Sequence, residues 1–177
     1  MNIAKLIGFL AGVGLALLLC TVAIRRRGIT DGSKKTEYDE RQKIARGEGY
    51  KYGYYTLVIY LCLILMIDMA ELKLPCSMTV VAFTGFCISG LVLSGYAIMH
   101  DAYWGVNNNA AFIIRVLIAL GAINLIYGIV EICKGNMVVN GILQDNVINL
   151  EAGILILGIG VMLLIAKNRD AHEESES

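Results

Sequence analysis

Four acidic residues in otherwise apolar stretches are the side chains whose type and spacing could do chemistry. They are Asp68, Glu71, Glu131 and Glu151. Carboxylate oxygens are the ligands that hard cations prefer, and a carboxylate inside a bilayer is a natural proton carrier. Asp68 lies deepest in its stretch, and Glu71 follows at i+3 on the same side of a helix. These four acids are therefore candidates for a cation or proton site; the alternative is that they reach the lipid headgroups or pair with Lys73 and Lys134.

Histidine offers a weaker candidate for catalysis. His100 precedes Asp101, and a histidine next to an aspartate can form an acid–base pair. Adjacent residues of a helix point about 100° apart, however, and need not touch. The only other histidine, His172, lies in an acidic tail, and no metalloprotease-like spacing occurs. We therefore predict no enzyme activity, no metal centre and no cofactor.

The five cysteines form no CxxC motif. Three of them lie inside apolar stretches and are expected to behave as small apolar side chains. Cys76 and Cys133 lie outside these stretches, on what we predict to be the outer side of a membrane, where disulfides persist. A Cys76–Cys133 disulfide is therefore a candidate.

The elements that must position these residues are apolar blocks separated by short polar segments. Hydrophobic residues make up 57% of the chain. Five blocks reach the roughly 20 residues that a spanning helix needs: 3–24, 54–72, 78–99, 111–132 and 147–166. Because hydrocarbon offers the backbone no hydrogen-bond partners, each block must be a helix. The sequence predicts an all-α integral membrane protein, a single bundle of five transmembrane helices.

The distribution of lysine and arginine predicts the orientation of the bundle. Twelve of the fifteen basic residues fall on one side if all five blocks span, nine of them in segment 25–53. Basic loops stay in the cytoplasm. We expect a bacterial plasma membrane protein with its N-terminus outside and its C-terminus in the cytoplasm, where residues 167–177 form a disordered acidic tail.

Segment 37–55 combines charges, glycines and tyrosines just before the second block. Thr36 followed by Asp39 approximates a capping box, and this predicts a short charged surface helix over 37–46. Three glycines between residues 47 and 53 predict a bend from this surface helix into the spanning one.

Two interpretations of this segment remain open. It can be a solvated cytoplasmic loop anchored by tyrosines, or a docking surface for a cytoplasmic protein or for anionic lipid. Its mixed charge favours a protein partner, and nothing indicates nucleic-acid binding. The candidate docking residues are Glu37, Asp39, Arg41, Lys43 and Arg46.

The leading functional hypothesis is therefore a non-enzymatic interaction or accessory subunit that docks a partner through residues 37–55. The alternative is a small cation- or proton-coupled carrier or channel component that uses the four carboxylates. Gly8 and Gly12 form a GxxxG motif in the first block, which permits close helix packing within the bundle or in a homo-oligomer.

The stretches "YDERQ" (38–42) and "ARGEGYKYGYYTLVIY" (45–60) resemble a juxtamembrane segment in uncharacterised small multi-span membrane proteins of Gram-positive bacteria. In those proteins a "DERQ" stretch, an "RGK-aromatic-KYGF" stretch and a spanning helix follow one another. The resemblance covers about residues 37–62, and Glu48 stands where lysine is expected. It implies a bacterial multi-span membrane protein and no catalytic residue.

Overall fold

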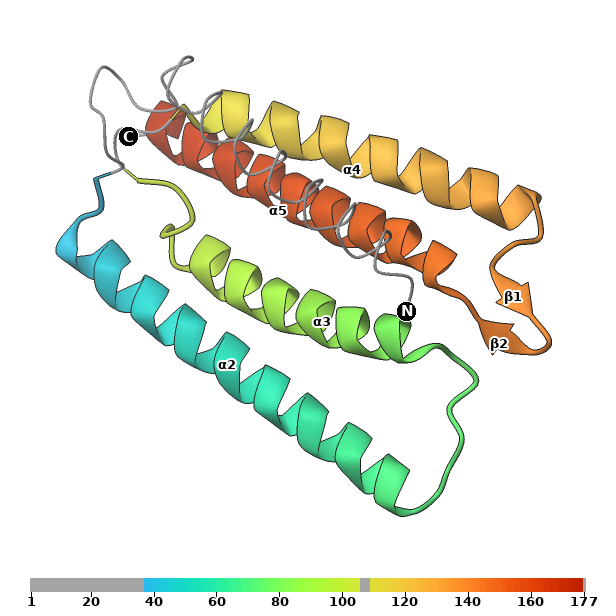
Figure 1. Cartoon of the computed structure of the whole chain (residues 1–177). Helices are drawn as coiled ribbons and strands as arrows, with labels where there is room; N and C mark the ends of the chain where they lie inside the picture. Colours follow the sequence, from blue (N-terminus) through green and yellow to red (C-terminus); the bar gives the residue numbers. More distant parts are fainter. Residues whose placement is uncertain (1–36, 106–108, 177) are drawn as a thin grey trace.

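The computed structural model describes residues 37–105 and 109–176, which form four long helices and a small hairpin (Figure 1). The helices are α2 (Glu40–Met69), α3 (Met78–Met99), α4 (Ala110–Cys133) and α5 (Ile148–Glu176). Helix α2 packs along α3, α3 contacts α5, and α4 packs along α5. The described chain is thus two helical hairpins joined through α3 and α5.

All four helices are long and apolar enough to cross a membrane, judged by length and composition. This confirms a largely helical chain suited to multiple membrane passes. The predicted first helix, 3–24, and its Gly8 and Gly12 lie outside the described residues. Helices α3 and α4 begin and end within one residue of the predicted blocks 78–99 and 111–132.

The predicted bend before the second block is wrong. Helix α2 runs without interruption from Glu40 to Met69, so the surface helix and the spanning helix are one element. The glycines do not bend it because two of them lie against α3. A Cβ on Gly53 would come within 3.3 Å of the Ser89 carbonyl oxygen, and Gly49 faces the ring of Tyr96. Their missing side chains serve close packing instead.

The predicted disordered tail also differs from the structure. Helix α5 continues beyond residue 166 and ends at Glu176. Segment 167–176 contains neither glycine nor proline, so nothing in its composition stops a helix that is already formed.

Glycine contacts hold α4 and α5 together along their length. A Cβ on Gly153 of α5 would lie 2.6 Å from the backbone nitrogen of Leu125, and one on Gly128 of α4 would lie 2.8 Å from the Cα of Leu150. Toward the other end of this pair, a buried apolar cluster joins α3, α4 and α5: Ile98, Ile114, Ile159 and Leu163. The α4–α5 hairpin and α3 therefore share the core of the described chain.

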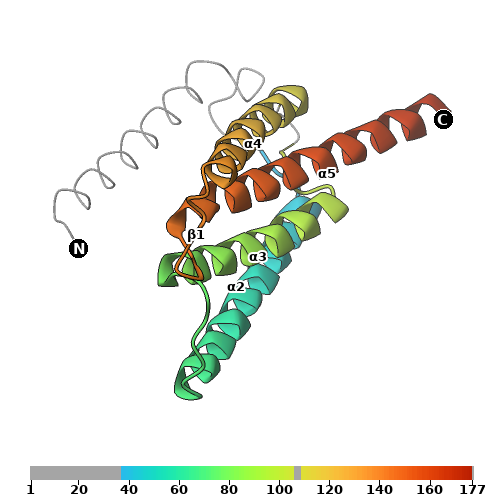
Figure 2. The same ribbon diagram turned by 90° about the vertical axis from the view of Figure 1, so that its right-hand side faces the viewer.

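Helix α2 stands apart from this core. Only 6% of its most apolar stretch is buried, against 17–22% for the other three helices. It touches α3 from Gly49 to Tyr60, whose hydroxyl donates to the Val81 carbonyl at 2.6 Å. Toward the α2–α3 loop the two helices diverge, as both ribbon views show (Figure 2). Ile64, Ile67 and Val81 line the space between them.

A two-residue hairpin follows α4, formed by β1 (Val138–Val139) and β2 (Ile142–Leu143). Asn140 and Gly141 at its turn both have positive φ, the conformation that an Asn-Gly turn supplies. Leu143 also exchanges backbone hydrogen bonds with the loop before α3, donating to the Pro75 carbonyl at 2.8 Å and accepting from the Ser77 nitrogen at 2.9 Å. The hairpin thereby links the two loops at this end of the bundle.

The predicted Cys76–Cys133 disulfide is not formed, because both thiols are free in the structure. Cys76 forms the backbone bridge with Leu143 and packs on the small buried cluster around Val80. Cys133 is the last residue of α4 and is exposed. Backbone pairing through Leu143, not a disulfide, connects the loops.

Candidate functional site

The start of α2 is fixed by a capping box three residues after the predicted one. Asp39 is the N-cap, and its carboxylate accepts a 2.6 Å hydrogen bond from the Gln42 nitrogen. The Gln42 amide oxygen accepts from the Asp39 nitrogen at 3.3 Å. Asp39 therefore orients the helix rather than offering a free carboxylate, and Thr36 lies outside the described residues.

One side of the first turns of α2 holds the turn between α3 and α4. The Gln42 side chain donates to the carbonyls of Asp101, at 2.8 Å, and of Trp104, at 3.3 Å. Arg46 donates to the carbonyls of Ala102, at 3.1 Å, and of Tyr103, at 3.3 Å. These contacts satisfy four consecutive carbonyls that no regular element pairs.

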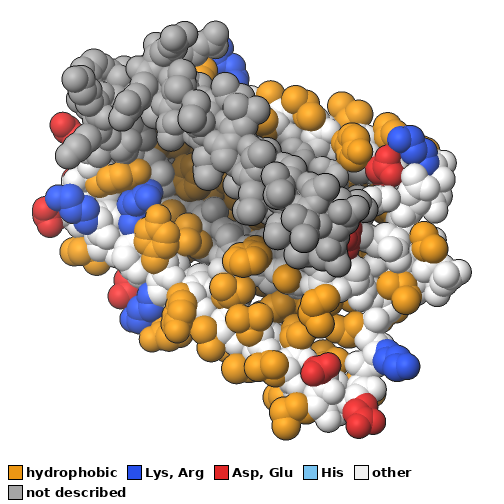
Figure 3. Space-filling view, in the orientation of Figure 1, with side chains coloured by type: hydrophobic (Ala, Val, Ile, Leu, Met, Phe, Trp, Pro, Cys, Tyr) orange, Lys and Arg blue, Asp and Glu red, His pale blue; other side chains and the backbone are white. Residues whose placement is uncertain are grey.

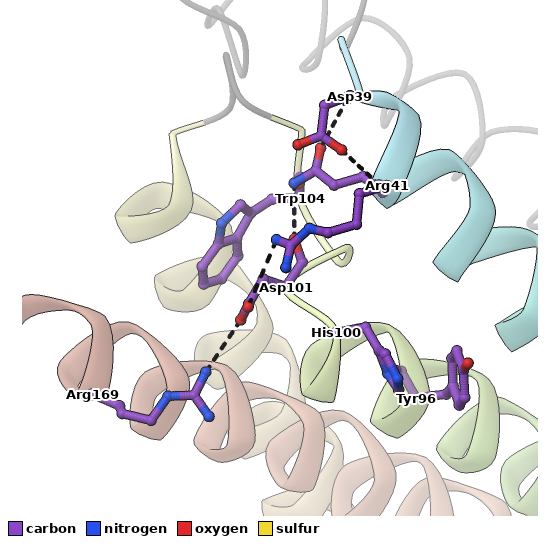
Figure 4. Close-up of polar contacts among 8 residues, drawn as sticks. Asp39, Arg41, Tyr96, His100, Asp101, Trp104 and Arg169 are labelled. Carbon is purple, nitrogen blue, oxygen red and sulfur yellow. Dashed lines mark hydrogen bonds and ion pairs between the residues drawn. The ribbon is translucent and has the colours of Figure 1, made fainter. Parts of the chain in front are cut away.

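Asp101 joins this turn to two helices at once. Its carboxylate accepts from Arg169 of α5 at 3.2 Å and lies 3.9 Å from the Arg41 guanidinium of α2 (Figure 4). We call the set Arg41, Gln42, Arg46, Asp101 and Arg169 the turn network. Burial in the same place raises the pKa of the Tyr103 hydroxyl, with a smaller opposing effect from Arg46. The turn network fastens the charged end of α2 to the α3–α4 turn and to α5.

The candidate docking residues therefore divide between two sides of α2. Asp39 and Arg46 serve the fold, and Arg41 reaches Asp101 although it is largely exposed. Lys43 points away and pairs with Glu40 at 2.9 Å. Glu37 is exposed just before the helix.

Ile44 lies on this outward side with 68% of its surface exposed. Neither Ile44 nor Gln42 was among the predicted site residues, and Asp101 was considered only as a partner of His100. The spacing D-x-x-Q in "DERQ" is a capping signal that could have identified Gln42. Nothing in the sequence places Asp101 beside Arg169, 68 residues further along the chain.

His100 and Asp101 do not form an acid–base pair. The His100 ring stacks on Tyr96 with 4.1 Å between ring centroids, and its Nδ1 contacts the Tyr96 carbonyl oxygen at 2.9 Å. Asp101 adopts a positive φ and is engaged by arginines. His172 belongs to the part of α5 whose side chains lie outside the description.

The four predicted carboxylates do not gather into one site. Asp68 is the second-last residue of α2 and Glu71 lies in the following loop, on the hairpin that diverges from the core. Glu131 is on α4, where it accepts from Lys134 at 2.9 Å and from Asn136 at 3.2 Å. The hydrogen bond with Glu131 raises the pKa of the Lys134 ammonium. Among the described residues no group of three histidine, cysteine or acidic side chains is placed to hold a metal ion.

Glu151 is the one predicted carboxylate set between helices. One oxygen accepts a 3.0 Å hydrogen bond from the Thr84 hydroxyl of α3. The other, Oε2, is enclosed and has no hydrogen-bond partner in the described part of the chain. Of the four acids predicted to form a cation site, Glu151 is therefore bonded to a neighbouring helix, and the other three lie at or just beyond helix ends.

Comparisons with known proteins identify no relative: no family model, no curated protein and no solved structure matches the chain.

Proposed function

We propose that this chain is a non-enzymatic membrane protein, an interaction or accessory subunit, that binds a partner protein through the outward side of the first turns of α2. We name this surface the α2 docking face and define it by Glu40, Lys43, Ile44 and Lys51. We further propose that it is cytoplasmic, in a bacterial plasma membrane, with the N-terminus outside and the C-terminus inside. The positive-inside rule supports this orientation.

The length of α2 supports the proposal. Its 30 residues extend for about 45 Å, whereas the hydrocarbon of a bilayer is about 30 Å thick. About ten residues therefore project beyond the membrane as a rigid continuation of the span. The turn network holds the inner side of this projection, so its outer side is presented in a fixed position.

Ile44 is the observation that carries the proposal. Ile44 is 68% exposed on a part of α2 that the length of the helix places outside the hydrocarbon. Lys43 with Glu40 and Lys51 with Glu48 form ion pairs near it, at 2.9 and 3.3 Å. Ile44 thus offers an apolar side chain for burial by a partner, and the ion pairs beside it offer polar contacts of the kind found at the rim of an interface.

The test is site-specific photocrosslinking in native membranes, with the photoreactive residue at position 44 in one chain and at position 45 in another. Ala45 is 7% exposed and faces inward, so it is a matched control one residue away. We expect position 44 to crosslink a defined protein that position 45 does not, and Ile44→Asp to abolish its co-purification. Crosslinking to lipid alone from position 44 would instead support the tyrosine-anchor interpretation.

A carrier function remains the second candidate because of Glu151. Its enclosed oxygen without a donor is the kind of buried polar atom that function can explain. If the chain conducts protons, Glu151→Gln should abolish flux into proteoliposomes, while Glu131→Gln should leave it unchanged. Wild-type protein that conducts nothing would remove this candidate.

A further inference from the structure

A cleft opens where α2 and α3 diverge. Its volume is about 810 Å³, within the roughly 300–1,000 Å³ of typical ligand sites. Ile64 and Ile67 of α2 form one wall, Val81 and Met78 of α3 form the other, and Ile142 of β2 also lines it. Both ribbon views show α2 and α3 diverging toward the end that carries the α2–α3 loop. These apolar walls come from the last two turns of α2 and the first turn of α3.

Three charged side chains lie at the mouth of the cleft. They are Asp68, Glu71 and Lys73. Acidic and basic side chains are visible together at this end of α2, next to the apolar surface of the helix (Figure 3). None of the three forms an ion pair within the described residues. The mouth therefore offers two unpaired carboxylates and one unpaired ammonium at the level where a spanning helix meets the headgroups.

We propose that this cleft is a binding site for one phospholipid with a primary-ammonium headgroup, such as phosphatidylethanolamine. An acyl chain lies between the apolar walls of α2 and α3. The headgroup ammonium donates hydrogen bonds to Asp68 and Glu71, and the phosphate pairs with Lys73. The inference does not depend on the docking proposal; it requires only that α2 and α3 span a bilayer.

The charges favour this lipid over the two main alternatives. An anionic lipid such as phosphatidylglycerol would be attracted by Lys73 but repelled by two carboxylates. Phosphatidylcholine carries the same net charge as phosphatidylethanolamine, but its quaternary ammonium has no N–H to donate. Charge-assisted hydrogen bonds from N–H to carboxylate are the stronger contacts.

The first test is native mass spectrometry of the full chain extracted from vesicles of equal parts phosphatidylethanolamine, phosphatidylcholine and phosphatidylglycerol. We expect one retained phosphatidylethanolamine per chain. Retention of this lipid should fall about fivefold in the double variant Asp68→Asn, Glu71→Gln, as expected for the loss of two partly exposed ion pairs. Glu131→Gln is the control, because that carboxylate lies on α4 and pairs with Lys134.

Cys76 lines the same cleft and provides a second, independent measurement. In a chain that keeps Cys76 as its single cysteine, maleimide labelling in nanodiscs should be slower with phosphatidylethanolamine than with phosphatidylcholine. A chain that keeps only Cys133, which is exposed at the end of α4, should label equally in both.

Several results would overturn the proposal. Equal retention of phosphatidylcholine would show that the headgroup is not recognised, and preference for phosphatidylglycerol would show that Lys73 dominates the mouth. A dimer without lipid would mean that a second copy fills the cleft. Protection of Cys76 in lipid-free detergent would mean that another segment of this chain fills it.

Discussion

The two helical hairpins both pack through glycine, but the glycines meet different neighbours. In the α4–α5 hairpin, a Cβ on Gly153 would lie 2.6 Å from the backbone nitrogen of Leu125. In the α2–α3 hairpin, a Cβ on Gly85 would also lie 2.6 Å from its nearest neighbour, but that neighbour is the ring of Tyr60. Backbone cannot move aside, whereas a ring at an open interface can.

The closely packed helices α3, α4 and α5 therefore differ from α2, which is less tightly attached. Helices α4 and α5 touch backbone to backbone, and α3 joins them through a buried cluster. Helix α2 touches α3 over its middle, is held by the turn network at one end and leaves a cleft at the other. Both surfaces proposed to bind something, the α2 docking face and the lipid cleft, involve α2. The rigid hairpin positions α3, and α2 presents the sites.

The largest expected effect is that of Gly153→Ala. Its added methyl group would overlap the backbone of Leu125, so the two helices must separate, at a cost of about 2–3 kcal/mol in the free energy of unfolding. Gly158→Ala is the matched control five residues along α5, because nothing lies within 4 Å of its Cβ position. Thermal unfolding in detergent measures both. Equal melting temperatures for the two variants would show that the α4–α5 contact is not close.

Arg46→Ala should have the next largest effect and lower the free energy of unfolding by about 1–2 kcal/mol. It removes a charged donor from the carbonyls of Ala102 and Tyr103. Trp104, the single tryptophan of the chain, lies in the same turn and should show a red-shifted emission as water enters. Lys43→Ala is the control, since its ion pair with Glu40 is exposed and contributes little to stability. An unchanged Trp104 spectrum in Arg46→Ala would contradict the role of the turn network.

Gly85→Ala sharpens the comparison between the hairpins. The added Cβ would lie as close to its neighbour as at Gly153, yet we expect a smaller loss in the free energy of unfolding, about 1 kcal/mol. The Tyr60 ring can swing toward lipid and loses only its hydrogen bond to the Val81 carbonyl. Hydrogen exchange should then increase in α2 and α3 without increasing in α4. A loss as large as that of Gly153→Ala would mean that the α2–α3 contact is as rigid as the α4–α5 one.

Gly47→Ala should have the smallest effect and the opposite sign. Gly47 is exposed in α2 and has nothing within 4 Å of its Cβ position, so alanine adds helix propensity without a clash. We expect the free energy of unfolding to rise by at most about 1 kcal/mol. Thermal unfolding beside Gly53→Ala, where Leu93 and Ser89 lie within 3.3 Å, gives the contrast. Destabilisation by Gly47→Ala would indicate that residue 47 needs a glycine backbone after all.

Much of the fold follows from the length of the apolar blocks. The bounds of α3 and α4 could be predicted because each block matches a spanning length and ends in polar residues. The start of α2 could not be predicted in this way, since a glycine can either bend a helix or let another helix approach. Only the position of the partner helix decides between the two. At Gly53 the partner is α3, and the glycine packs.

The hairpin at Asn140–Gly141 was within reach of the sequence, because Asn-Gly between apolar residues is a strong turn signal. The arrangement of the four acids, in contrast, could not be predicted from the sequence. Asp68 and Glu131 each lie near the end of their helix. Whether two helices at one depth are neighbours depends on packing between helices, which the spacing of residues within each helix does not record.

The uninterrupted α2 has a mechanical consequence. A bend at the glycines would let the first turns of α2 move independently of the rest, whereas in one uninterrupted helix they cannot. Gly53, which packs on α3, lies about 20 Å along the helix from Glu40 and about 24 Å from Met69. Because the turn network holds the first turns against the α3–α4 turn, it also fixes the direction in which α2 leaves that end. The width of the cleft at the far end of α2 therefore depends in part on contacts made at the opposite end of the helix.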